Sequence, residues 1–226
     1  MGAGRLVLMV EGESELLSVP KLVSRMLPPN LRLSGKPFQI GGVSNLVHRR
    51  NGAWELVKNK HGDGCPKWHS FLRNARDSHV LLLLDGDGSS DSGRKFCAWD
   101  AARFLAQAAQ EVGAGAVFSL AVVFVRQEFE SWLLAGCPEL SKQLDDAELS
   151  RLEEMPRDAK KRIRDIVKGG YREVIDQPKF TGNLDVTALR SRMRSFRRFE
   201  NALKQLADAA EDGHHVCTPS KQGECG

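Results

Sequence analysis

The chain has 226 residues, of which 41% are hydrophobic and 27% are charged, and its formal net charge is +4. This length holds one large domain or a domain with an appendage, and the composition excludes wholesale disorder and a fibrous protein. The longest apolar runs fall short of the roughly 20 residues that span a bilayer. Because no secretory signal pattern is present either, we expect a cytoplasmic protein without membrane contact.

The first part of the chain alternates short apolar runs with amphipathic segments. Residues 6–10 predict a buried strand, and the segment from Ser14 to about residue 27 predicts a helix. The elements expected next are a short strand at 38–40, a helix at about 66–75, a strand at 79–84, a helix at about 95–112 and a strand at 116–125. Buried strands that alternate with helices predict the α/β class, with a mostly parallel sheet flanked by helices.

Beyond Pro138 the apolar strand runs disappear and helical spacing takes over, most clearly over residues 195–210. We therefore expect three parts in the chain. They are an α/β core over residues 1–136, a basic helical extension packed on that core over 137–210, and a flexible tail over 211–226.

Positive charge is concentrated in the predicted extension. Residues 157–198 contain thirteen Lys or Arg against five Asp or Glu, so the rest of the chain is acidic overall. Such a basic segment suits contact with a nucleic-acid backbone, although a solvated helix face explains basic runs as well.

Acidic residues follow each of the three strongest predicted strands. Glu11 follows the first, Asp85 and Asp87 the second, and Glu128 and Glu130 the third. In an open parallel sheet ligands bind beyond the carboxyl ends of the strands, so these side chains are candidate site residues. Carboxylate oxygens are the donors that Mg²⁺ prefers, and the ion is usually held by one or two of them.

The Asp-Gly-Asp-Gly run has interpretations other than metal binding. A solvated turn has the same composition. An EF-hand loop is excluded, because Ser90 and Phe96 stand where that loop requires Gly and Glu. A Walker A phosphate loop is absent from the chain.

The spacing of these motifs resembles a known domain. Residues 10–15 (VEGESE) and 84–87 (LDGD) resemble the Toprim domain, a Rossmann-like fold shared by primases, topoisomerases and overcoming-lysogenization-defect nucleases. Residues 127–133 (QEFESWL) and 177–180 (QPKF), followed by Asp185 and Ser195-Phe196, resemble an uncharacterised Toprim-like bacterial family often encoded beside an ATPase.

The resemblance implies roles for individual residues. Glu11 would act as general acid or base and as metal ligand, and Asp85 and Asp87 would bind Mg²⁺ or Mn²⁺. Glu128 or Glu130 would complete a site for a second ion, as in two-metal phosphodiester cleavage. Lys179, expected on a loop over the site, would stabilise charge on the phosphate, although an exposed lysine without a function is the alternative.

Two further sets of residues are less specific. Glu13 and Glu15 fall in the first turn of a predicted helix, where the helix dipole favours acidic residues without any chemistry. Arginine suits phosphate through its planar guanidinium group, and four arginines around Ser195-Phe196 are candidates for backbone contacts: Arg190, Arg194, Arg197 and Arg198.

The leading hypothesis from the sequence is a Mg²⁺- or Mn²⁺-dependent nuclease that cleaves DNA or RNA with one or two metal ions. The family resemblance implies a role in antiviral (anti-phage) defence with a partner ATPase. The alternative is a non-catalytic regulatory or adaptor subunit of an ATPase complex, in which the acidic site binds metal or nucleotide. Retention of Glu11 together with Asp85 and Asp87 favours catalysis, because a binding module could lose them.

Overall fold

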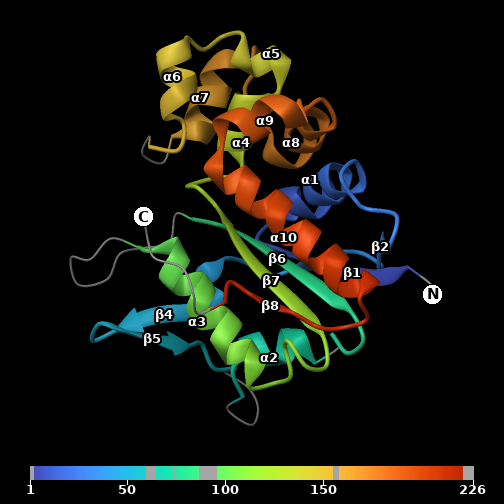
Figure 1. Cartoon of the computed structure of the whole chain (residues 1–226). Helices are drawn as coiled ribbons and strands as arrows, with labels where there is room; N and C mark the ends of the chain where they lie inside the picture. Colours follow the sequence, from blue (N-terminus) through green and yellow to red (C-terminus); the bar gives the residue numbers. More distant parts are fainter. Residues whose placement is uncertain (1–2, 60–64, 74, 87–95, 155–157, 221–226) are drawn as a thin grey trace.

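The computed structural model describes residues 3–59, 65–73, 75–86, 96–154 and 158–220. Its centre is a six-stranded sheet in which every described strand pair is parallel (Figure 1). The strand order is β2 (Leu31–Leu33), β1 (Gly4–Val10), β6 (His79–Asp85), β7 (Ser119–Val125) and β8 (Cys217–Thr218), and β3 (Phe38–Gln39) pairs with β1 beyond the end of β2.

The three long strands end in line with one another. Val10 of β1 is the partner of Leu83 in β6, and Asp85 of β6 is the partner of Val125 in β7. The residues that follow β1, β6 and β7 therefore meet at one edge of the sheet, which is the edge where parallel α/β sheets bind ligands. We call it the carboxyl edge.

Alternate side chains of the strands enter two separate hydrophobic cores, as the period of two along a strand requires. Leu6, Leu8 and Val10 belong to the first core, with α1 (Glu13–Ser24) and α10 (Arg194–Glu211). Val7 and Met9 belong to the second core. That core is covered by the 3₁₀ turn η1 (Val43–Asn45), the hairpin β4 (Val47–Arg50) and β5 (Ala53–Leu56), and the helices α2 (Lys67–Leu72) and α3 (Ala98–Gln110).

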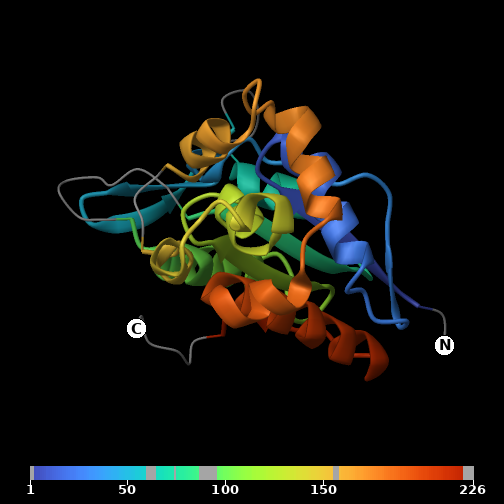
Figure 2. The same cartoon turned by 90° about the horizontal axis from the view of Figure 1, so that it is seen from above.

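The remaining helices gather at the end of the sheet where the carboxyl edge lies, as Figure 1 shows. They are α4 (Glu130–Gly136), α5 (Pro138–Ser141), α6 (Asp146–Arg151), α7 (Ala159–Ile166), α8 (Glu173–Gly182) and α9 (Val186–Arg192). The first core runs from the sheet into this group through Trp132, whose ring contacts the rings of Phe196 and Phe199 in α10. Seen from above, α8 lies beside α1 (Figure 2).

The predicted α/β class, with a mostly parallel sheet and a C-terminal helical region, is confirmed. The prediction of a flexible tail over 211–226 is wrong for Cys217 and Thr218, which form β8 along β7. Val216 anchors this strand, because its carbonyl accepts a hydrogen bond from the Leu120 amide and its side chain packs on the first core. A two-residue strand is too short to give a periodic signal. No helix in the described ranges combines the length and the hydropathy needed to cross a membrane.

Candidate active site at the carboxyl edge

Glu11 and Asp85 meet at the carboxyl edge although 74 positions separate them in the sequence. The Asp85 amide donates a hydrogen bond of 2.9 Å to Oε2 of Glu11. The Gly41 amide donates a hydrogen bond to the Glu11 carbonyl, and a Cβ atom at Gly42 would lie in ordinary contact with Oε1 of Glu11, at 3.4 Å. Both glycines have positive φ. The strand register thus brings the predicted general acid or base and one predicted metal ligand together.

Asp85 in turn connects β6 to the segment after β7. Its Oδ1 accepts a hydrogen bond of 3.0 Å from the Phe129 amide. The next residue, Gly86, passes so close to β7 that a Cβ atom there would collide with the Val125 carbonyl oxygen. Two residues after the end of β7, Gln127 has a φ of +66°, a left-handed conformation that non-glycine residues rarely adopt. A tight backbone crossing therefore fixes the position of Asp85.

Glu130, at the start of α4, is fully buried. Its Oε1 accepts hydrogen bonds from the Tyr171 hydroxyl at 3.0 Å and from Nε2 of Gln177 at 3.3 Å. Its Oε2 is buried, and no donor in the described part of the chain forms a hydrogen bond with it. Burial, reinforced by the charge of Glu15 and opposed by Lys160 and the Tyr171 hydrogen bond, raises the pKa of Glu130 to about 7. A buried acceptor without a donor favours a proton or a cation beside it.

Gln177 of α8 joins two carboxylates from different helices. Its Nε2 donates to Oε1 of Glu15 at 2.8 Å as well as to Glu130. The other Glu15 oxygen accepts from the Gly12 amide at 2.9 Å, which ties this side chain to the start of its own helix. Glu15 therefore has a structural explanation, as the sequence alternative suggested. Glu13 lies in the first turn of the same helix.

Lys160 is the cation that faces the carboxylates. It is half-buried at the start of α7, and its Nζ forms an ion pair of 3.2 Å with Glu173. Burial alone would lower the pKa of this ammonium group, but the negative charges of Glu130, Glu173 and Asp85 outweigh burial and raise it. Lys160 therefore stays charged next to the carboxyl edge.

Glu128 differs from Glu130 in its surroundings. Its Oε2 accepts a hydrogen bond of 3.2 Å from the backbone amide of Lys160, in the first turn of α7. A carboxylate in that position is stabilised by the helix dipole and by otherwise unpaired amides. Glu128 thus anchors α7, and Glu130 has the chemistry of a metal ligand more clearly than Glu128 does.

Lys179 does not lie on a loop, and that prediction is wrong. It belongs to the last turn of α8, a helix that continues through Pro178. Its side chain is exposed, and its Nζ lies 5.8 Å from the centre of the Phe180 ring. Two residues on a helix differ by about 200° in direction, so Lys179 points away from the side of α8 on which Gln177 meets the carboxylates.

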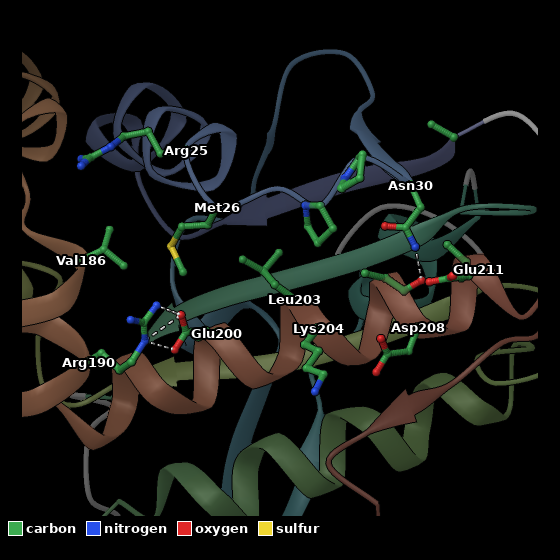
Figure 3. Close-up of a pocket in the computed structure, with 15 residues that line it drawn as sticks. Arg25, Met26, Asn30, Val186, Arg190, Glu200, Leu203, Lys204, Asp208 and Glu211 are labelled. Carbon is green, nitrogen blue, oxygen red and sulfur yellow. Dashed lines mark hydrogen bonds and ion pairs between the residues drawn. The ribbon is translucent and has the colours of Figure 1, made fainter.

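The predicted backbone-binding arginines are largely occupied elsewhere. Arg190 forms an ion pair with Glu200 at a cavity of about 750 Å³, which Figure 3 shows to be lined by both positive and negative side chains. Arg197 donates to the carbonyls of Arg190 and Ser191 and so holds α9 against α10. Arg194 and Arg198 are exposed at the start of α10. This cavity is not the uniformly positive channel that phosphate binding favours.

Oxygen donors at the carboxyl edge fit the chemistry of a hard divalent cation. Within the described ranges, however, no group of three or more His, Cys, Asp or Glu side chains is placed to hold a metal ion. The predicted ligand Asp87 lies outside the described residues. Two carboxylates are enough for Mg²⁺ when water and substrate phosphate complete its shell, so Glu11 and Asp85 fit the ion, and the unpaired Oε2 of Glu130 fits a further cation.

Sequence reasoning missed Lys160 and the bridging role of Gln177. A usable signal for Lys160 exists, because residues 160 and 163 share one helix face, on which Ile163 is fully buried. A lysine in an apolar stripe needs a buried partner of opposite charge. No comparable pattern marks Gln177, because its two partners come from distant segments.

Comparison with known proteins gives one family match. A search among curated proteins finds no match. Two solved structures of the C-terminal region of the OLD protein from Xanthomonas campestris pv. campestris are similar to this chain at 14% and 15% identity. The matched region covers 93% of this chain in both comparisons. It covers 95% of the first structure and 98% of the second, with TM-scores of 0.39 and 0.37. The model of the family described as "Domain of unknown function (DUF4276)" matches residues 10–204, and the chain belongs to that family.

Proposed function

We propose that this protein is a Mg²⁺- or Mn²⁺-dependent phosphodiester hydrolase that cleaves nucleic acid. The observation that carries the proposal is the hydrogen bond from the Asp85 amide to Glu11, which joins two carboxylate-bearing residues at the carboxyl edge. The order and spacing of the Toprim-like motifs support it. An anti-phage role with an ATPase partner follows from the family resemblance alone.

Glu11 and Asp85 would hold the catalytic ion, together with Asp87 if the LDGD resemblance extends to its function. Once bound, the ion would activate a water molecule and neutralise charge on the scissile phosphate. The roles proposed for the side chains of Glu130 and Lys160 follow from their surroundings. Glu130, with a pKa of about 7, can hold or release a proton near neutral pH or complete a second ion's shell.

Lys160 takes the role that the sequence assigned to Lys179. Its ammonium group is charged, and the negative charges of Glu130 and Asp85 contribute to raising its pKa. A fixed positive charge close to a metal site stabilises the additional negative charge that develops on phosphate in the transition state. Lys179, exposed on the other side of α8, lacks such neighbours among the carboxylates that the structure describes.

The test uses the purified full chain with supercoiled plasmid, linear duplex DNA, single-stranded DNA and RNA, in Mg²⁺, Mn²⁺ or EDTA. We expect metal-dependent cleavage of at least one substrate, and its loss in Glu11→Gln and Asp85→Asn, which keep the shape of the side chains. Glu111→Gln, an exposed carboxylate at the end of α3, is the matched control. Cleavage that survives both site substitutions would contradict the proposal. Metal binding without cleavage would favour the adaptor alternative.

A further inference from the structure

Positive charge is concentrated on the exposed side of α7 and in the segment that follows it. Residues 159–172 contain six Lys or Arg and one acidic residue. Lys161, Arg164 and Lys168 are exposed, whereas Ile163 on the opposite side of the helix is fully buried in the first core. We call these three cations the α7 basic face, although Lys168 lies in the turn just after the end of α7 at Ile166. No ion pair joins any of them to a carboxylate in the ranges that the structure describes.

This face begins at the candidate active site. Lys160, which precedes the first cation of the face, donates its amide to Glu128 and pairs through Nζ with Glu173. The same ammonium group interacts electrostatically with Asp85. Figure 1 shows α7 among the helices gathered at the carboxyl edge. A chain of phosphates held on the α7 basic face would therefore be led toward Glu11 and Asp85.

The chemistry of the face matches a phosphate backbone. Arg164 offers the planar fork that binds phosphate oxygens, and the lysines offer point charges. Lys161 and Arg164 are three residues apart on α7, about 4.5 Å at helical rise, which is close to the roughly 3.4 Å of duplex axis per phosphate on one strand. Lys168 follows in the turn beyond the end of the helix. The spacing suits successive phosphates.

The composition of the segment also distinguishes between kinds of nucleic acid. Proteins that hold single strands stack bases on exposed aromatic rings, but Tyr171, the one aromatic residue of 159–172, is buried against Glu130. Recognition of duplex RNA uses polar contacts to 2′-hydroxyl groups, but residues 159–172 contain no Ser, Thr, Asn or Gln. A basic segment that offers neither an exposed aromatic ring nor an uncharged polar side chain favours contact with the phosphates of duplex DNA.

We propose that Lys161, Arg164 and Lys168 bind the phosphate backbone of duplex DNA and lead it to the carboxyl edge. This inference rests on the proposed function, because it assigns the substrate and its path to the same site. The α7 basic face takes the place of Arg190 and Arg197, which the sequence predicted to bind the nucleic-acid backbone. Arg190 instead forms an ion pair with Glu200, and Arg197 donates hydrogen bonds to backbone carbonyls.

The experiment measures binding without cleavage. Fluorescence anisotropy of the full chain with a labelled DNA duplex, RNA duplex or single strand is recorded in EDTA at several KCl concentrations. The variant is Lys161→Gln/Arg164→Gln/Lys168→Gln. The control, Arg32→Gln/Lys36→Gln/Lys204→Gln, removes the same charge from exposed positions on β2, the loop that follows it, and α10. Circular dichroism and urea unfolding establish that both variants are folded.

The slope of log affinity against log salt is negative, and we expect the α7 variant to reduce its magnitude by about 2 to 3. Each phosphate contact on duplex DNA contributes about 0.9 to that magnitude. The control should keep the wild-type slope. Equal slopes in all three proteins would overturn the inference, as would an α7 effect confined to duplex RNA or single strands. Because cleavage is scored separately, DNA binding through α7 without any cleavage would contradict the proposed function alone. Cleavage with α7-independent binding would contradict this inference alone.

Discussion

The amide of Asp85 donates a hydrogen bond of 2.9 Å to Oε2 of Glu11. This contact is a direct consequence of the β1–β6 register, in which Val10 is the partner of Leu83, so that the residues after each strand meet at one edge. The geometry of the candidate active site is therefore fixed by the parallel sheet, and the properties of the two carboxylates can be tested separately from catalysis.

Divalent metal should stabilise the folded chain. A ligand that binds only the folded state at ten times its Kd adds about 1.4 kcal/mol to the free energy of unfolding, which raises the Tm of a chain of this size by about 3–6 °C. We expect such a rise with Mn²⁺ or Mg²⁺ relative to EDTA, measured by differential scanning fluorimetry. It should disappear in Glu11→Gln/Asp85→Asn and persist in Glu111→Gln. An equal rise in the double variant would place the metal elsewhere.

Replacement of Lys160 should impair cleavage far more than replacement of Lys179. Lys160→Met removes a charged group that faces Asp85 and Glu130, and loss of one stabilising group typically lowers kcat by about 10²-fold or more. Lys179→Met removes an exposed side chain and should change kcat by less than about threefold. Rates are measured at saturating metal, with the metal-induced Tm rise retained as evidence of an intact site. Equal losses in the two variants would refute the assignment.

Glu130 should make stability depend on pH. Its folded-state pKa of about 7 lies above the ordinary carboxyl value of 4.5, so the folded state retains a proton that the unfolded state loses. The stability from this protonation is present below pH 4.5 and is lost as pH rises through 7, by up to about 3 kcal/mol at 1.36 kcal/mol per pKa unit. Urea unfolding in EDTA from pH 5 to 8 should show this fall for wild type but not for Glu130→Gln.

The matched control for this experiment is Glu200→Gln. Its exposed ion pair with Arg190 lowers the pKa of Glu200, so stability from that carboxylate is present above its unfolded pKa and is lost only at more acidic pH. Between pH 5 and 8 the Glu200→Gln profile should run parallel to wild type. Parallel profiles for Glu130→Gln and wild type would show that Glu130 is ionised when folded.

The long elements of the fold were predictable from the sequence because each carries its own periodic pattern. The apolar runs of β1, β6 and β7 and the helical spacing of α10 fall where expected, within a few residues. The strand β2, the β4–β5 hairpin and β8 were missed. Strands of two to four residues depend on their neighbours in the sheet for stability and leave little local signal.

The candidate site was predictable in part for a related reason. Glu11 and Asp85 lie at strand ends, so a parallel sheet brings them to one edge whatever surrounds them. Lys160, Tyr171 and Gln177 reach Glu130 only through the packing of α7 and α8 against α4, which no local pattern specifies. Pro178 made α8 look like a loop, although the structure accommodates it within the helix.

Gly86 should be sensitive to the smallest substitution. A Cβ atom there would collide with the Val125 carbonyl oxygen and lie 3.3 Å from the Gln127 amide nitrogen, and both neighbours are backbone atoms that cannot rotate away. Gly86→Ala should therefore lower the free energy of unfolding by about 1–3 kcal/mol, the usual cost of overpacking. It should also disturb the Asp85 contact with Phe129 and reduce metal stabilisation, because both depend on this crossing.

Gly182 provides the comparison for that substitution. It lies in α8, and a Cβ atom added there meets no atom within 4 Å. Ala is preferred over Gly in a helix by up to about 1 kcal/mol, so Gly182→Ala should leave the free energy of unfolding unchanged or raise it slightly. Urea unfolding of both variants measures the difference. If Gly86→Ala were as stable as Gly182→Ala, the backbone of Gly86 would be less tightly packed against Val125 than the Cβ contact indicates.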